Sequence, residues 1–148
     1  MATISDILRH KNTHSDTSAR GGTVTVAPDS TIADLASTLT DNHIGAAVVL
    51  DRGAVAGIVS ERDIVRHLAH GGVLDRPVSE IMTTDVVTCG RDDALEQIAQ
   101  TMTERRIRHM PVLDDGQLVG IVSIGDVVSS RIRQLEQERT QLEQYVAG

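Results

Sequence analysis

The sequence predicts a mixed α/β (α+β) protein in which one β-α-β-β-α unit occurs twice and a helix follows at the C-terminus. Three observations support this prediction: the chain repeats itself, each copy alternates strand-like and helix-like patterns, and the apolar residues are almost all aliphatic. The 148 residues include one Tyr and no Phe or Trp, so a core must be built from Val, Ile, Leu, Ala and Met. A chain of this length is near the usual size of one domain.

The internal repeat becomes clear when the chain is aligned with itself. Residues 23–66 match residues 86–129 without a gap, with 17 identities in 44 positions, whereas unrelated segments share roughly three. Upstream, "ISDIL" (4–8) resembles "VSEIM" (78–82) at an offset of 74 instead of 63, so the first copy has 11 extra residues. The expected organisation has three parts. The first repeat spans residues 1–72 and includes an N-terminal helix and a long loop at 9–23, the second repeat spans residues 73–132, and a helical tail spans residues 133–148.

The first half of each copy predicts a strand and then a helix. β-branched runs ended by turn residues open the copies, at 23–28 and 85–90. Apolar residues at helical spacing follow, at 32–39 and 95–102. Asp29 and Asp92 stand just ahead of these helices and are placed to cap them.

The second half of each copy predicts a hairpin and a further helix. Two strand-like runs flank an Asp/Gly turn, at 44–50 and 54–60 in the first copy and at 108–113 and 117–123 in the second. The helices after the hairpins are expected to begin near Arg62 and Gly125. One unit of this size buries both faces of its sheet poorly, so we expect the two copies to pack sheet against sheet about a pseudo-two-fold axis, with two equivalent clefts between them.

Composition excludes several classes of function. The net charge of −7 and the near absence of aromatic residues argue against nucleic-acid binding, which needs a basic field or stacking side chains. No apolar run reaches the length of a membrane helix, and the N-terminus has no secretory signal pattern. The single Cys89 agrees with a reducing compartment. We therefore expect a cytoplasmic protein with no nucleic-acid and no membrane partner.

The segment "GIVSxxD" occurs twice, at residues 57–63 and 120–126. Its Ser and Asp stand where a helix begins, and the simplest interpretation is a capping box. The same geometry suits a ligand, because a helix N-terminus with a hydroxyl favours a phosphate and a carboxylate one turn along can hold ribose hydroxyls. From these residues alone both interpretations stay open.

The doubled "GIVSxxD" segments, in register behind their hairpins, resemble a pair of CBS domains, the arrangement called a Bateman module. The resemblance extends from Ile4 to about Ile132. It implies a non-enzymatic regulatory sensor that needs no cofactor, binds an adenosine-containing ligand (AMP, ADP, ATP, NAD or S-adenosylmethionine) in the clefts, and commonly forms a disc-shaped homodimer.

The resemblance also implies two sets of binding residues. In each set the Asp holds the ribose hydroxyls, the Ser approaches the phosphate and an Ile lies against the base: Asp63, Ser60 and Ile58 at the first motif, and Asp126, Ser123 and Ile121 at the second. The expected remainder of the first site is Arg62, Val87, Ile107 and Arg108, and that of the second is Arg108, His109, Val24, Ile44, Gly45 and Ala46. The cation in "SERD" is missing from "SIGD", so we expect unequal clefts.

Other candidate sites are weaker. His67 and His70 share a helix end, but no Cys or carboxylate cluster completes a metal site in the sequence, and we expect none. Cys89 is expected in the core, and neither motif Ser has a neighbouring base, so an enzyme is the weakest hypothesis.

The C-terminal tail has Ile132, Leu135, Leu142 and Val146 near heptad spacing, with Arg139 in the middle core position. It predicts either a helix docked on its own repeat or a dimer contact, and we favour the dimer. No effector domain is visible, so a signal would pass to an unidentified effector protein or through the dimer. The alternative function is a ligand-free structural or interaction module, in which the motif residues serve as caps alone.

Overall fold

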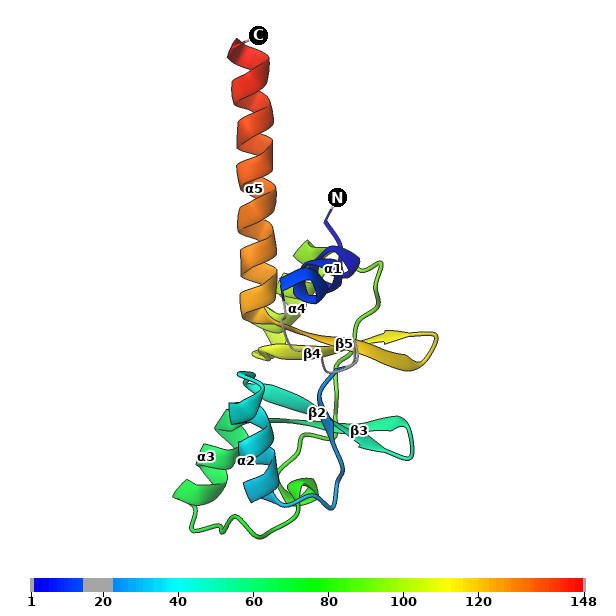
Figure 1. The fold of residues 1–148 in the computed structure, drawn as a ribbon, viewed down its shortest axis with the longest axis vertical. Coiled ribbons are helices and arrows are strands. Elements are labelled where there is room, and N and C mark those ends of the chain that lie inside the picture. Colours follow the sequence, from blue (N-terminus) through cyan, green and yellow to red (C-terminus); the bar gives the residue numbers. More distant parts are fainter. Residues whose placement is uncertain (1, 15–22, 148) are drawn as a thin grey trace.

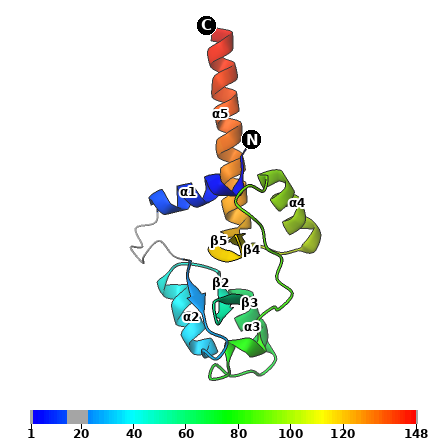
Figure 2. The ribbon, with the colours of Figure 1, turned by 90° about the vertical axis from the view of Figure 1, so that its right-hand side faces the viewer.

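The structure, a computed structural model, describes residues 2–14 and 23–147, and of residues 12–14 it describes the backbone alone. The two hairpins lie next to each other in the middle of the molecule, and the helices lie outside them (Figures 1 and 2). The elements are, in chain order, α1 (Ile4–His14), β1 (Thr25–Val26), α2 (Ile32–Asp41), β2 (Ala46–Asp51), β3 (Ala54–Ser60), α3 (Glu61–Ala69), the 3-10 helix η1 (Val78–Glu80), α4 (Leu95–Arg105), β4 (His109–Asp114), β5 (Gln117–Ser123) and α5 (Ile124–Ala147). The mixed fold of two β-α-β-β-α copies with a C-terminal helix is confirmed.

Both hairpins close through a two-residue turn with left-handed backbone. Arg52 and Gly53 have φ angles of 53° and 82°, and the corresponding Asp115 and Gly116 have 49° and 77°. Positive φ at both central residues gives a turn whose twist matches that of the flanking strands. The register also shifts at the same place in both hairpins, after Val49 and after Val112. The hairpins predicted from the Asp/Gly turns are confirmed.

The strands that open each copy are shorter than the β-branched runs predict. In the first copy only Thr25 and Val26 form a strand, which pairs in parallel with β2. In the second copy the strand is reduced to one parallel bridge between Cys89 and Val112. Turns follow at once, where the Ser30 amide donates to the Ala27 carbonyl and the Asp93 amide to the Gly90 carbonyl, so the extended segments end early.

The helix caps also differ from expectation, and neither Asp29 nor Asp92 is the N-cap. Thr31 caps α2, and its hydroxyl accepts from the Asp34 amide at 3.1 Å. The N-cap of α4 is Ala94, which has no side-chain cap. Each helix begins two residues later than an Asp cap requires, because a turn stands between the Asp and the helix.

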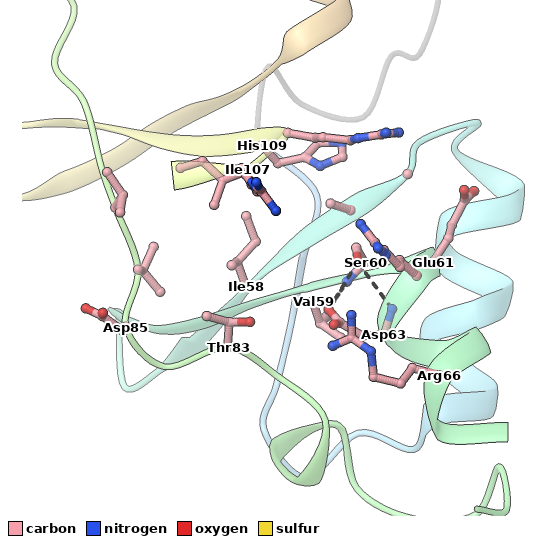
Figure 3. Close-up of a pocket in the computed structure, with 17 residues that line it drawn as sticks. Ile58, Val59, Ser60, Glu61, Asp63, Arg66, Thr83, Asp85, Ile107 and His109 are labelled. Carbon is pink, nitrogen blue, oxygen red and sulfur yellow. Dashed lines mark hydrogen bonds between the residues drawn. The ribbon is translucent and has the colours of Figure 1, made fainter. Parts of the chain in front are cut away.

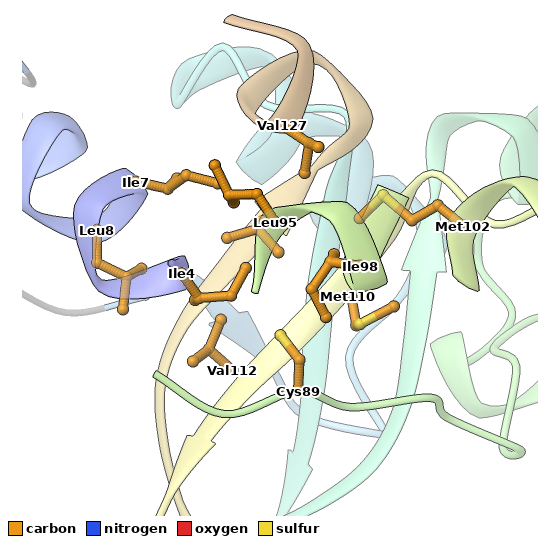
Figure 4. Packing of buried hydrophobic residues seen from close by; sticks show 11 residues of the cluster. Ile4, Ile7, Leu8, Cys89, Leu95, Ile98, Met102, Met110, Val112 and Val127 are labelled. Atoms are coloured by element: carbon orange, nitrogen blue, oxygen red, sulfur yellow. The ribbon is translucent and has the colours of Figure 1, made fainter. Parts of the chain in front are cut away.

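The upstream elements of the two copies are exchanged. Ile4, Ile7 and Leu8 of α1 are buried in the core of the second repeat, against residues such as Leu95 and Val112 (Figure 4). Val78, at the position that corresponds to Ile4, is buried in the core of the first repeat. Isolated bridges tie each crossing element in place, Thr3 to Ala94 and Thr31 to Pro77.

Two further features bear on function. Residues 9–14, expected as the start of a loop, continue α1 as helix; the other expected loop residues up to 22 lie outside the described part of the chain. α5 is one unbroken helix of 24 residues that projects away from the body (Figure 1). Within residues 2–14 and 23–147, no helix is long and apolar enough to cross a membrane.

Candidate functional site

The first motif forms a complete capping box at the start of α3. The Ser60 amide donates to Asp63 Oδ2 at 2.9 Å, and the Asp63 amide donates to Ser60 Oγ at 3.3 Å. The Ser60 hydroxyl also donates to Asp63 Oδ2 at 3.1 Å. Capping therefore fixes the direction of the Asp63 carboxylate, and the structural and ligand-binding interpretations of the motif share one geometry.

A cavity of about 340 Å³ lies beside Asp63, within the size range of small-molecule sites. Ile107, just before β4, and His109, at its start, lie on one side of it, while Ile58 and Thr83 lie on the other (Figure 3). Both repeats contribute to the lining: Gly45, Ala46, Ile58, Val59, Ser60, Glu61, Arg62, Asp63 and Arg66 come from the first, and Thr83, Asp85, Val86, Val87, Arg106, Ile107, Arg108 and His109 from the second.

The charges around this cavity are mixed, with four positive and three negative side chains. Four arginines line it, Arg62 and Arg66 from α3 and Arg106 and Arg108 from the turn between α4 and β4. Arg106 has a left-handed φ of 56°, which ends α4 and turns the chain toward β4. Three carboxylates, of Glu61, Asp63 and Asp85, also line it. In a chain of net charge −7, four guanidinium groups at one cavity suit an anion.

His109 lies between the two motifs. Its side chain lines the cavity beside Asp63, while its backbone pairs with Ser123 of the second motif. Burial lowers the pKa of His109 below its ordinary value; Asp126 and Glu61 act to raise it, and Lys11 and Arg108 to lower it. The lowered pKa favours the neutral ring of His109, which can both donate and accept a hydrogen bond.

The second motif has the same cap but carries an additional cation. The Ser123 amide donates to Asp126 Oδ2 at 2.9 Å, and the Asp126 amide donates to Ser123 Oγ at 3.1 Å. Lys11 Nζ of α1 lies 2.8 Å from Asp126 Oδ2 and donates to the Ile121 carbonyl at 2.9 Å. Burial acts to raise the pKa of Asp126, but the hydrogen bonds from Lys11 and Ser123 outweigh burial and leave that pKa below its ordinary value.

The structure gathers ten of the fifteen expected site residues around the first cavity: Gly45, Ala46, Ile58, Ser60, Arg62, Asp63, Val87, Ile107, Arg108 and His109. Gly45, Ala46 and His109 were expected at the second motif. Ile44 packs instead against the core of the first repeat, and Val24 does not line the cavity beside Asp63. The other three, Ile121, Ser123 and Asp126, lie together near Lys11.

Several residues around the two motifs were not predicted from the sequence. Arg66 lies one helical turn beyond Arg62 on α3, so helical spacing was a usable signal. Asp85 and Lys11 each stand three residues beyond the upstream match of 4–8 with 78–82. Glu61, Thr83, Val86 and Arg106 offered no comparable pattern.

The remaining reactive side chains have structural partners. Cys89 is buried, and burial raises the pKa of its thiol to about 12, with Asp93 as a smaller cause. The rings of His67 and His70 lie 2.8 Å from the carbonyl oxygens of Val73 and Arg66. Within the described ranges, no group of three or more His, Cys, Asp or Glu is placed to hold a metal ion.

Two exchanged α/β repeats, with a capped Ser-x-x-Asp motif at the end of each hairpin, define a tandem module with paired motif sites. The family model for the CBS domain matches residues 20–70 and 78–133, and the chain belongs to this family. The CBS domain-containing protein CBSX3, mitochondrial, of Arabidopsis thaliana is 34% identical over 99% of this chain and 72% of its own length. The crystal structure of the CBS-domain containing protein ATU1752 from Agrobacterium tumefaciens is 42% identical, with a TM-score of 0.78, over 88% of this chain and 99% of that one.

Two further similar structures contain adenosine compounds. The CBS domain protein PAE2072 from Pyrobaculum aerophilum, 29% identical with a TM-score of 0.71, was solved with AMP; the match covers 84% of this chain and 89% of that one. The CBS domain pair of protein MJ0100, 28% identical with a TM-score of 0.75, was solved with 5-methylthioadenosine and S-adenosyl-L-methionine; here the match covers 92% and 98%. These two CBS-domain proteins of the same fold thus bind adenosine-type ligands.

Proposed function

We propose that this chain is a non-enzymatic regulatory module that binds an adenosine nucleotide, of the AMP, ADP, ATP or NAD type, in the cavity beside Asp63. The observation that carries the proposal is the lining of that cavity, where a carboxylate held by its cap, apolar side chains and four arginines meet. Asp63 would accept the ribose hydroxyls, Ile58 and Ile107 would contact the base, and the arginines would face the phosphate. A phosphorylated ligand fits this charge better than the cationic S-adenosylmethionine does.

A ligand in this cavity would contact both repeats, because the lining comes from residues 45–66 and 83–109. It would therefore stabilise whichever arrangement of the repeats closes around it. Such differential binding is the physical basis of a population shift, and it is how a sensor without a catalytic site transmits occupancy. The signal would reach an effector protein or a second copy of this chain.

We further propose that the second copy binds along α5. Val128, Ile132, Leu135, Leu142 and Val146 are exposed apolar residues on this helix, and with Arg139 they follow the alternating spacing of four and three residues that defines a coiled-coil seam. Residues 136–147 are exposed throughout, so the tail does not dock on its own repeat. A heptad seam is complementary to an identical seam, which favours a homodimer over an unrelated partner.

The proposal is tested by thermal-shift and calorimetric titration with AMP, ATP, NAD and S-adenosylmethionine. A ligand at 100 times its dissociation constant adds about 2.7 kcal/mol of stability. Asp63→Asn retains a hydrogen-bonding side chain for the cap but removes the charge, and we expect it to weaken binding roughly tenfold to a hundredfold. Asp92→Ala, which removes an exposed carboxylate, is the control and should bind like the parent.

The alternative, a ligand-free structural module whose Ser and Asp residues serve as caps alone, makes the opposite prediction. In that case no adenosine compound shifts the melting temperature, and Asp63→Asn changes stability without changing any titration.

A further inference from the structure

The carboxylate of the second motif is already paired with a cation from another element. Lys11 Nζ lies 2.8 Å from Asp126 Oδ2 and also donates to the Ile121 carbonyl. Ile121 and Asp126 correspond to Ile58 and Asp63 at the offset of 63. At the first motif the donors to Asp63 Oδ2 are the amide and hydroxyl of its own cap residue.

The difference arises where the two upstream segments diverge. After Met82 the chain is extended, and Thr83 pairs with Ile58 through two backbone hydrogen bonds, of 3.0 and 2.9 Å. After the corresponding Leu8 the chain stays helical as far as His14. The helix brings Lys11 to the Ile121 carbonyl. In the first repeat, the corresponding Ile58 carbonyl accepts from the backbone amide of Thr83 instead.

The two crossing segments also bring opposite charges to their motifs. Asp85 stands three residues after Met82, as Lys11 stands three residues after Leu8, and Asp85 lines the first cavity. Because this residue is an Asp, it brings no cation to Asp63. At the second motif, Lys11 pairs with Asp126 and neutralises it. The crossing segments thus bring a cation to the second motif and a carboxylate to the first cavity.

α1 is held firmly enough to keep Lys11 in place. Ile4 and Ile7 are almost fully buried in the second repeat, and Leu8 packs directly over Gly120. The Ile4 and Ser5 amides donate to the Asp93 and Arg91 carbonyls at 3.1 and 2.9 Å. A ligand at Asp126 would have to displace the ammonium while the helix that carries it stayed anchored.

We propose that Lys11 closes the second cleft by acting as an internal cation on Asp126, so that this chain binds one nucleotide, at Asp63. The inference rests on the proposed nucleotide binding and adds which of the two motifs is used. Lys11 is thereby a specificity-determining residue: it selects the site without contacting the ligand at Asp63.

Calorimetric titration of the full chain with AMP tests this assignment. We expect one AMP per chain in the parent protein and two in Lys11→Met, which keeps the apolar stem but removes the charge. In the Lys11→Met background, Asp126→Asn should restore a stoichiometry of one. Lys11→Arg keeps a cation and should stay at one, and Arg9→Ala, which alters an exposed ion pair with Asp6 on the same helix, should match the parent. Circular dichroism of each variant verifies that α1 remains helical.

The outcomes separate the two proposals. Two AMP per parent chain, or a Lys11→Met variant that still binds one, would overturn the closure of the second cleft while nucleotide binding stands. Weaker binding in Lys11→Met would also overturn it, because Lys11 would then be a ligand contact. If AMP binds Lys11→Met but not the parent, and Asp126→Asn abolishes that binding, closure is supported and the assignment to Asp63 fails. If neither chain binds AMP, both proposals fall for this ligand.

Discussion

Ile4 and Val78 occupy corresponding positions of the two copies, and each is fully buried in the core of the other repeat. Each repeat therefore completes its core with a side chain supplied by its partner. The exchange joins the two halves into one folding unit, and it also sets the path of α1 across the second motif. Stability and site selection are thus coupled through the N-terminal helix.

Ile4→Ala should destabilise the whole chain, although Ile4 stands four residues from the N-terminus. Removing a fully buried Ile side chain typically costs about 2–5 kcal/mol, because the cavity collapses only in part. We expect a single unfolding transition in urea at a lower midpoint, since the exchanged cores unfold together. Val65→Ala, at an exposed position of α3, is the control and should change stability little; equal midpoints for the two variants would contradict the exchange.

Gly57 and Gly120 provide a matched pair for the crossing segments. A Cβ on Gly57 would lie 2.8 Å from both the Met82 sulfur and the Thr83 carbonyl oxygen, while one on Gly120 would lie 2.6 Å from a terminal methyl of Leu8. The backbone at Thr83 cannot rotate away from an added methyl as the Leu8 side chain can. Gly57→Ala should therefore be the more destabilising variant, and we expect it to lower the free energy of unfolding by about 1–3 kcal/mol. Chemical denaturation measures both. The reverse order would show that the Thr83 segment yields more easily than Leu8.

The pH dependence of stability should carry a contribution from His109. Burial lowers its pKa in the folded state, so below the ordinary histidine pKa the unfolded chain binds the proton more readily than the folded chain does. The free energy of unfolding should therefore fall as pH drops from about 7 toward 5. His109→Asn removes this contribution, and its stability should decline less over the same range than that of the parent. Parallel pH curves for the two proteins would rule out a depressed pKa.

The proposed α5 seam predicts that oligomeric state depends on its apolar residues. Leu135→Ser with Leu142→Ser should shift the chain toward monomer in sedimentation equilibrium, because both positions lie in the seam. Arg139→Leu should strengthen association, since it replaces the one charged core position with an apolar side chain. Gln141→Ser lies next to the seam and serves as the control. A parent chain that is monomeric at all concentrations, or a double variant as dimeric as the parent, would disprove a dimer through α5.

The repeated letters of the sequence were enough to predict the fold class, the two hairpins and the capped Ser-x-x-Asp motifs. Local chemistry decides these features: Asp/Gly turns need left-handed backbone, and a Ser followed three residues later by an Asp satisfies free amides at a helix start. The strands predicted at 23–28 and 85–90 are shorter in the structure. β propensity does not determine whether the backbone groups form hydrogen bonds with a neighbouring strand or within an early turn.

The sequence by itself determined that there are two related motifs, at Asp63 and Asp126, with different neighbouring charges. Tertiary structure alone decided which surroundings each motif meets. The correspondence of Ile4 with Val78 can be read from the sequence. Only the packing shows that each residue lies in the core of the other repeat. Because that crossing lays a helix beside one motif and an extended segment beside the other, Lys11 pairs with Asp126 while a cavity remains at Asp63. Long-range contacts of this kind have no signature in local sequence.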